Sequence, residues 1–170
     1  MKSQRPLRAV GDERAIVRAG SPVHLDDTDK AIIRELQVDG RMPYAKLGPL
    51  VGLSQAAVRQ RVQRLIDSGA MQVVAVTDPI AVGFSLEALI AVNVDGNLRE
   101  VADALAAIEQ ATYVVITTGR YDIMCEVVCE NTDELLTLVN EVIRQTPGVS
   151  HAETFTYMHL TKQSYSWGTR

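Results

Sequence analysis

The chain has 170 residues and a formal net charge of −4, with 46% hydrophobic and 22% charged side chains. This is the composition of an ordinary globular protein, and it excludes a disordered one. No apolar run reaches the roughly 18 residues of a membrane span, and the N-terminus lacks a signal-peptide-like apolar segment. We therefore expect a cytoplasmic protein without a membrane partner, built as one large domain or two small ones.

The charge is distributed unevenly along the chain. Residues 1–78 carry 12 lysines and arginines against 9 acidic side chains, whereas residues 79–170 carry 5 against 12. Such asymmetry is typical of two modules with different partners. Because phosphate repels acidic surfaces, we expect the second half to point away from any nucleic acid.

The first 24 residues predict a flexible basic arm, since five basic side chains are interspersed with prolines and glycines. The pattern then becomes helical, with Asp26 as a candidate N-cap. Apolar side chains of this helix recur on one face: Ile32, Ile33 and Leu36. A second helix is expected over 43–51, short or kinked because Pro49 lacks a backbone donor.

The stretch from Gly52 to Gly69 predicts the turn and second helix of a helix-turn-helix. Ser54 is a natural N-cap, and the following apolar stripe is Val58, Val62, Leu65 and Ile66. The opposite face carries arginine and glutamine, which pair with bases and phosphates, and no carboxylate until Asp67. An ordinary surface helix would instead mix both charge signs. We therefore expect DNA contacts from Ser54, Gln55, Ala56, Ala57, Arg59, Gln60, Gln63 and Arg64.

These expected contacts divide by position on the helix. The residues near its start are expected to contact base edges: Gln55, Ala56, Ala57, Arg59 and Gln60. Contacts with phosphate or solvent are expected from Gln63, Arg64 and Lys46. Arg61 lies between two apolar positions, so a structural ion pair with Asp26 or Asp29 is favoured over a base contact.

The segment 71–77 is rich in β-forming residues and is interpreted as the wing of a winged helix, with a linker over 78–84. Strands are expected over 85–94, 112–118, 121–130 and 152–160. One helix begins near Leu98; another, near Thr132, turns four side chains inward: Leu135, Val139, Val142 and Ile143. The order βαββαβ predicts a ferredoxin-like domain over 85–162, followed by a tail over 163–170.

One strand of this domain carries both cysteines. Cys125 and Cys129 alternate with a second set of side chains, so we expect them to be buried free thiols rather than metal ligands. The other set is mixed and partly apolar: Met124, Glu126 and Val128. Such a face is best explained by sheet-to-sheet dimerisation.

Several motifs together carry a family resemblance over about residues 25–160. They are Leu25-Asp26-x-x-Asp29-x-x-Ile32-Ile33, Gly52-Leu53-Ser54-x-x-x-Val58-x-x-Arg61-Val62-x-Arg64-Leu65, Asp78-Pro79-x-x-x-Gly83, Thr118-Gly119-Arg120-Tyr121-Asp122 and Pro147-Gly148-Val149. The chain resembles the leucine-responsive and asparagine-type (Lrp/AsnC) transcription regulators. It departs from their pattern at Gly48-Pro49 and at Ala70-Met71.

The resemblance implies an α+β protein, with an N-terminal winged helix-turn-helix over 25–77 and a C-terminal ligand-sensing ferredoxin-like domain. It also implies homodimers that assemble into tetramers or octamers, and a small-molecule effector, often an amino acid. Carried over by position, the effector loop is Thr118, Gly119, Arg120, Tyr121 and Asp122. Its chemistry agrees, because Gly119 allows a tight turn with exposed backbone amides and Asp122 suits an α-amino group. A carboxylate is suited by either Arg120 or these amides. Alternatively, Gly119 and Asp122 only shape the hairpin.

We therefore expect a sequence-specific regulator that binds double-stranded DNA at a palindromic operator and responds to a small molecule. No cofactor, metal or catalytic residue is expected. The alternative is a tetrapyrrole decarboxylase of the sirohaem type, which resembles the family in both domains. It would need histidines and arginines around its substrate, and the chain has only His24, His151 and His159. RNA binding by the sheet would need exposed aromatics and positive charge, which this acidic half lacks.

Overall fold

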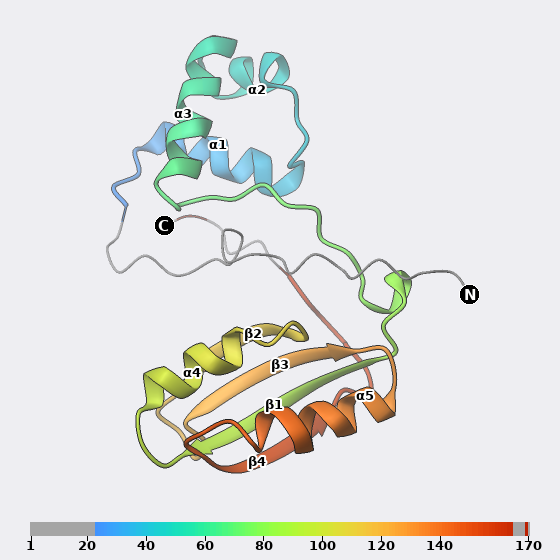
Figure 1. Ribbon diagram of the computed structural model, residues 1–170. Coiled ribbons are helices and arrows are strands. Elements are labelled where there is room, and N and C mark those ends of the chain that lie inside the picture. The colour runs from blue at the N-terminus through green and yellow to red at the C-terminus, as the bar shows by residue number, and fades with distance from the viewer. Residues whose placement is uncertain (1–22, 165–168, 170) are drawn as a thin grey trace, which may run out of the picture. The chain divides into compact units, whose positions relative to one another are not determined.

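The computed structural model describes residues 23–164 and residue 169. The chain forms two compact units that divide between Val76 and Thr77, a helical one and one built on a sheet (Figure 1). The expected basic arm lies almost entirely outside the described residues, as does most of the expected tail. No helix in the described part is long and apolar enough to cross a membrane.

The helical unit consists of α1 (Asp27–Val38), α2 (Tyr44–Leu50) and α3 (Gln55–Asp67). The expected cap of α1 is confirmed as a reciprocal capping box. Asp26 Oδ1 accepts from the Asp29 amide at 2.7 Å, and Asp29 Oδ2 accepts from the Asp26 amide at 3.2 Å. Both carboxylates thus lie at the positive end of the helix dipole, where they are favoured.

A single apolar cluster holds the three helices together. Its buried members are Ile32, Ile33, Leu36, Met42, Leu47, Val58, Val62 and Leu65. The expected inward faces of α1 and α3 are therefore confirmed with one exception. Ile66 is 36% exposed, because it lies in the last turn of α3, beside rather than on the buried stripe.

The departure at Gly48-Pro49 has a structural reason. The helix α2 is short, as expected, and contains Pro49. Gly48 is buried, and a Cβ placed on it would lie 2.6 Å from the backbone oxygen of Leu53. The chain turns this tightly because the Leu53 amide donates to the Gly48 carbonyl at 2.9 Å. Glycine at this position allows the close approach of α2 to the turn before α3.

Replacing Gly48 by alanine is expected to lower the free energy of unfolding by about 1–3 kcal/mol, because the added methyl group meets backbone. In an open helix the same change would stabilise by about 0.5–1 kcal/mol. Urea unfolding followed by circular dichroism measures the difference. Gly119→Ala is the control, since no atom lies within 4 Å of its Cβ position. A stabilising Gly48→Ala substitution would contradict the tight turn.

The prediction that residues 71–77 form a β-strand wing is wrong. Residues 71–77 form no strand in the described structure, although the segment is rich in β-branched side chains. Val73, Val74 and Val76 are 52%, 65% and 58% exposed. β propensity alone does not make a strand, because a strand needs a neighbour to accept its backbone hydrogen bonds.

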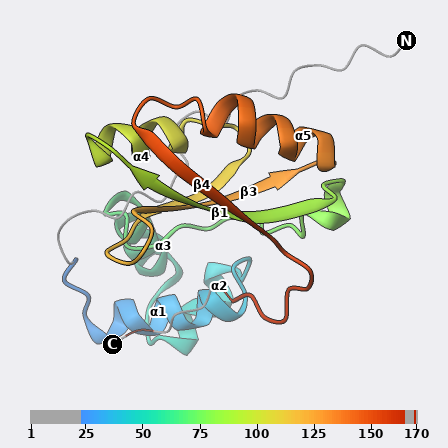
Figure 2. The same cartoon turned by 90° about the horizontal axis from the view of Figure 1, so that it is seen from below.

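The second unit has the expected ferredoxin-like order. It comprises β1 (Leu86–Val94), α4 (Leu98–Ala106), β2 (Ala111–Ile116), β3 (Ile123–Cys129), α5 (Thr132–Thr137) and β4 (Val149–Thr156), preceded by a short 3-10 turn, η2 (Ile80–Val82). The strands lie in the order β2-β3-β1-β4, and each adjacent pair is antiparallel. Both helices cover the same face of this sheet, which leaves the other face open (Figure 2).

The core of this unit lies between the sheet and its two helices. From β3 it takes four residues: Ile123, Cys125, Val127 and Cys129. The expected buried free thiols are confirmed, and burial raises the pKa of each thiol to about 11. At neutral pH both cysteines are therefore protonated and unreactive.

The last helix and the last strand differ from those expected. The strand β4 begins at Val149 and ends at Thr156, so the expected strand over 152–160 is shifted toward the C-terminus. The helix α5 continues as a π-helical turn, η3 (Leu138–Ile143), which buries Leu138 and leaves Val142 41% exposed. The inward position expected for Val142 is therefore wrong. A π turn holds more residues than an α turn, so the ordinary helical spacing changes phase there.

Candidate DNA-binding face and effector loop

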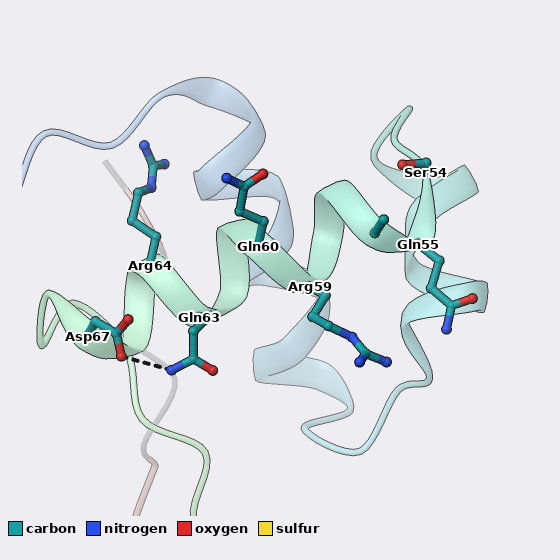
Figure 3. A pocket seen from close by; sticks show the side chains of 8 residues that line it. Ser54, Gln55, Arg59, Gln60, Gln63, Arg64 and Asp67 are labelled. Carbon is teal, nitrogen blue, oxygen red and sulfur yellow. Dashed lines mark hydrogen bonds between the residues drawn. The ribbon is translucent and has the colours of Figure 1, made fainter.

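The exposed side of α3 forms an open hollow in the first unit (Figure 3). Its N-cap is Ser54, whose Oγ accepts from the Ala57 amide at 3.2 Å. The lining residues are Ser54, Gln55, Ala56, Arg59, Gln60, Gln63, Arg64 and Asp67. Of the expected DNA contacts, only Ala57 lies off this surface, because it is half-buried. The face is thus rich in amide and guanidinium donors, which suit base edges and phosphates.

Asp67 is the lining residue that was not expected as part of the site. Its Oδ1 accepts from Gln63 Nε2 at 2.8 Å, and Figure 3 shows the two side chains turned toward each other. The spacing of four residues along a helix was the available signal. Gln63 is therefore partly engaged within the helix, while Arg59 and Gln55 extend into the open (Figure 3).

The three arginines of α3 have different surroundings. Arg61 Nη1 donates to Asp26 at 2.6 Å and to Asp29 at 2.9 Å, which is the ion pair expected from the sequence. Arg64, expected at phosphate or solvent, also pairs with Asp29 although its side chain is 57% exposed. Among the described residues Arg59 has no acidic partner within ion-pair distance. It is the guanidinium of α3 that DNA can bind without competition from a carboxylate.

The ion pair also predicts an acid response. Hydrogen bonding from Arg61 lowers the pKa of Asp26 from 3.8 to about 2. Because the folded-state pKa is the lower one, the pair stabilises the helical unit above about pH 4 and is lost as the pH falls through about 2. The Asp26→Asn chain should therefore lose less of its unfolding temperature over this range than the unaltered chain. Equal losses in thermal scans would mean that the pair contributes nothing.

The expected effector loop connects β2 to β3, and hydrogen bonds tie it to the end of β1. The Asp122 amide donates to the Val92 carbonyl at 2.9 Å, and Asp122 Oδ2 accepts from the Val94 amide at 2.8 Å. Asn93 Nδ2 donates to the Arg120 carbonyl at 2.9 Å. The Thr117 hydroxyl donates to the Tyr121 carbonyl. Asp122 therefore shapes the hairpin with one carboxylate oxygen.

Gly119 is not required by the turn. Its φ is not positive, unlike that of five other glycines in the described chain, and a Cβ there would meet nothing within 4 Å. The turn that Gly119 was expected to allow therefore has room for a side chain. The neighbouring Thr118 and Arg120 are exposed. The missing side chain therefore leaves open space in the loop that also carries Arg120 and Asp122.

The open face of the sheet is mixed, as expected from Met124, Glu126 and Val128, which are half-buried. Carboxylates and phenols meet on it. Tyr157 donates to Glu126 Oε1 at 2.8 Å, and Tyr121 donates to Glu153. Burial, and then the nearby charges of Glu126 and Asp78, raise the pKa of Glu87. Glu153 carries no local sequence signal, because only the register of β4 places it here. Tyr157 follows the end of β4 and is joined to this face by its hydrogen bond to Glu126.

Comparison with known proteins places both units in one family. The AsnC-type helix-turn-helix domain matches residues 25–66, and a C-terminal dimeric alpha+beta barrel domain of AsnC-type regulators matches residues 76–170. The chain belongs to the Lrp/AsnC family. A curated relative, the HTH-type transcriptional regulator FL11 of Pyrococcus horikoshii, is 34% identical over 84% of this chain and 95% of its own length.

Solved structures of the family agree. The leucine response regulatory protein LrpA of Mycobacterium tuberculosis superposes with a TM-score of 0.75 at 29% identity, covering 82% of this chain and 96% of that one. A transcriptional regulator from Neisseria meningitidis, solved as an L-Met complex, has a TM-score of 0.75 at 25% identity, covering 84% and 96%.

The family assignment fixes the general function. This Lrp/AsnC protein is a DNA-binding transcription regulator with a helix-turn-helix domain and an α+β domain, and it is not an enzyme. The tetrapyrrole decarboxylase alternative is thereby set aside, since the curated relatives are named as regulators.

Proposed function

We propose that this regulator binds a palindromic operator as a homodimer and that an amino acid bound at the loop 118–122 changes its assembly or its DNA affinity. The observation that carries the DNA part is the open face of α3, where Gln55 and Gln60 are exposed and Arg59 has no acidic partner among residues 23–164. The start of such a helix enters the major groove, and two symmetry-related helices read two half-sites.

The operator contacts follow from the positions along α3. The residues of its first turns approach base edges, and the N-cap Ser54 precedes them: Gln55, Ala56, Ala57, Arg59 and Gln60. Gln63, Arg64 and the exposed Lys46 lie nearer the phosphates. Because Arg64 also pairs with Asp29, its contact with phosphate would be held in one orientation.

The open face of the sheet supports the dimer. Its half-buried apolar and acidic side chains leave a mixed surface that helices do not cover (Figure 2). A second copy packed on this face would bury it by a two-fold contact, from which larger assemblies such as tetramers or octamers could be built. The family model that matches this unit describes a dimeric barrel, which agrees with that arrangement.

The amino-acid effector is supported by the chemistry of the loop. The exposed guanidinium of Arg120 suits an α-carboxylate, and the second oxygen of Asp122 suits an α-amino group. The space beside Gly119 is free of protein atoms within 4 Å of a Cβ position. A family member has been solved with L-methionine bound. Ligands of this class therefore fit the charges that the loop presents.

Genomic fragments retained by the full chain, sequenced with and without a mixture of amino acids, test the function. We expect retained fragments to share a palindrome and to change with the mixture. Sedimentation of the protein with each amino acid separately then identifies the ligand. Retention without any shared sequence would contradict sequence-specific binding. An unchanged assembly and unchanged operator affinity with every amino acid would contradict the effector.

Within this proposal, Gly119→Thr is expected to abolish the response to the active amino acid and to leave folding unchanged. The added side chain occupies the free space of the loop, where a Cβ meets no protein atom within 4 Å. Calorimetric titration measures ligand binding, and urea unfolding measures stability. The control is Ser150→Thr, an exposed position on the edge strand β4. Unchanged ligand affinity in the Gly119→Thr chain would move the site away from this loop.

A further inference from the structure

One side chain of the loop 118–122 reaches beyond the loop. The Tyr121 hydroxyl donates to Glu153 of β4, and this hydrogen bond raises the pKa of the phenol. The Tyr121 ring packs edge-on against Phe155, with ring centroids 6.5 Å apart and an interplanar angle of 76°. Edge-to-face pairs of this kind are a favoured aromatic geometry. Two residues of β4 therefore hold Tyr121.

Both contacts lie on the open face of the sheet. Glu153 is opposite Ala91, and Phe155 is opposite Leu89, in the register of β4 with β1. These are the positions that alternate with the buried core residues Ile90 and Val92, so they point away from the helices. Tyr121 consequently joins the loop to the face on which a second copy would pack.

The same ring is contacted from within the loop. The guanidinium carbon of Arg120 lies 5.4 Å from the centroid of the Tyr121 ring, a distance at which cation–π attraction acts. The loop backbone is fixed to β1 by Asp122 and by the carbonyl of Arg120 itself. Arg120 can therefore exchange the ring for a ligand carboxylate without breaking a backbone hydrogen bond.

We propose that Tyr121 is the positioning residue that transmits effector binding from Arg120 to Glu153 and Phe155 on the open face of the sheet. This inference rests on the proposed effector site. A carboxylate that pairs with Arg120 withdraws the guanidinium from the Tyr121 ring. The ring then shifts against Phe155, and the hydrogen bond to Glu153 weakens. The packing of the second copy responds, because both residues belong to the face on which it lies.

Tyr157 provides the matched control. It also donates from a phenol to a carboxylate on this face, Glu126, at 2.8 Å. It follows the end of β4, and among the described residues no side-chain hydrogen bond or ring contact joins it to the loop. Removing either hydroxyl deletes one phenol–carboxylate hydrogen bond of the same type. Only Tyr121→Phe removes the hydrogen bond that links the ring contacted by Arg120 to Glu153.

The test is a double-mutant cycle on the full chain that requires no ligand. Arg120→Gln, Glu153→Gln and the double substitution are compared by the dissociation constant of self-association in sedimentation. Arg120 and Glu153 both contact Tyr121, from different elements. We expect the double variant to depart from the product of the single effects by roughly twofold or more. In the Tyr121→Phe background the departure should vanish, and in the Tyr157→Phe background it should persist.

Hydrogen exchange of the β4 amides serves as a second measurement. It measures the coupling between Arg120 and Glu153 even if the assembly does not dissociate. Independent effects in both measurements, or coupling that survives Tyr121→Phe, would overturn the proposal. If Tyr121 were only structural, Tyr121→Phe would lower the unfolding temperature, and the effects of Arg120→Gln and Glu153→Gln on self-association would be independent. Since no effector is added, failure of the cycle is distinct from failure of any amino acid to bind.

Discussion

Replacing Arg59 by alanine is expected to weaken operator binding by about 1–3 kcal/mol, which is roughly 5-fold to 150-fold in affinity. Arg59 is exposed in the first half of α3 and is the arginine of this helix without an acidic partner in the described chain. If it pairs with guanine, the loss falls on the operator and the sequence preference relaxes. Fluorescence-anisotropy titrations with the operator and with a scrambled duplex separate these effects.

The control for Arg59 is Arg99→Ala. Arg99 is also exposed and lies in the first turn of α4 in the other unit, so its removal changes the net charge equally. We expect it to leave operator affinity nearly unchanged. A loss for Arg59→Ala that is equal on both duplexes, with a salt slope reduced by about 1, would make it a phosphate contact. No loss at all would contradict the assignment of the α3 face.

Replacing Asp29 by asparagine is expected to destabilise the helical unit by about 1.5–3 kcal/mol, because hydrogen bonds to a charged group are lost. Asp29 is only 1% exposed, and its carboxylate pairs with both Arg61 and Arg64. It also completes the capping box of α1 through the Asp26 amide. The neutral amide leaves the two guanidinium groups without their shared counter-charge and removes one acceptor of the cap. Thermal unfolding followed by the helical circular-dichroism signal measures the loss.

Asp27→Asn is the matched control, because Asp27 is exposed and lies in the same first turn of α1. It removes one helix-dipole contact, which is worth about 0.3–1 kcal/mol. We therefore expect Asp29→Asn to cost several times more than Asp27→Asn. Comparable losses would show that the dipole, rather than the ion pairs with Arg61 and Arg64, determines the effect of Asp29. In that case the arginines of α3 would not need Asp29 for their positions.

Local patterns were sufficient to predict most elements of the fold. Asp26 and Ser54 cap the helices they were expected to cap, and the apolar stripes of α1 and α3 form one cluster. The alternation in β3 identified its buried side and its free thiols. These features depend on residues within a few positions of one another, which is why sequence alone shows them.

The failures depend on partners that are remote or absent along the chain. The segment 71–77 has strand-forming side chains but no neighbouring strand within the described structure. Val142 turns outward because a π-helical turn changes the phase of the helix. No pattern in the sequence predicted this turn. The links from Tyr121 to Glu153 and from Arg64 to Asp29 join residues more than thirty positions apart. Only the assembled fold brings these groups together.

The central claim is that the arginine- and glutamine-bearing side of α3 binds duplex DNA. An anisotropy titration of the full chain with a labelled operator duplex, begun at low salt and repeated as salt is raised, tests it most directly. We predict saturable binding whose logarithmic affinity falls linearly with the logarithm of salt concentration and is reduced by Arg59→Ala. No binding at low salt, or binding that Arg59→Ala leaves unchanged, would contradict it.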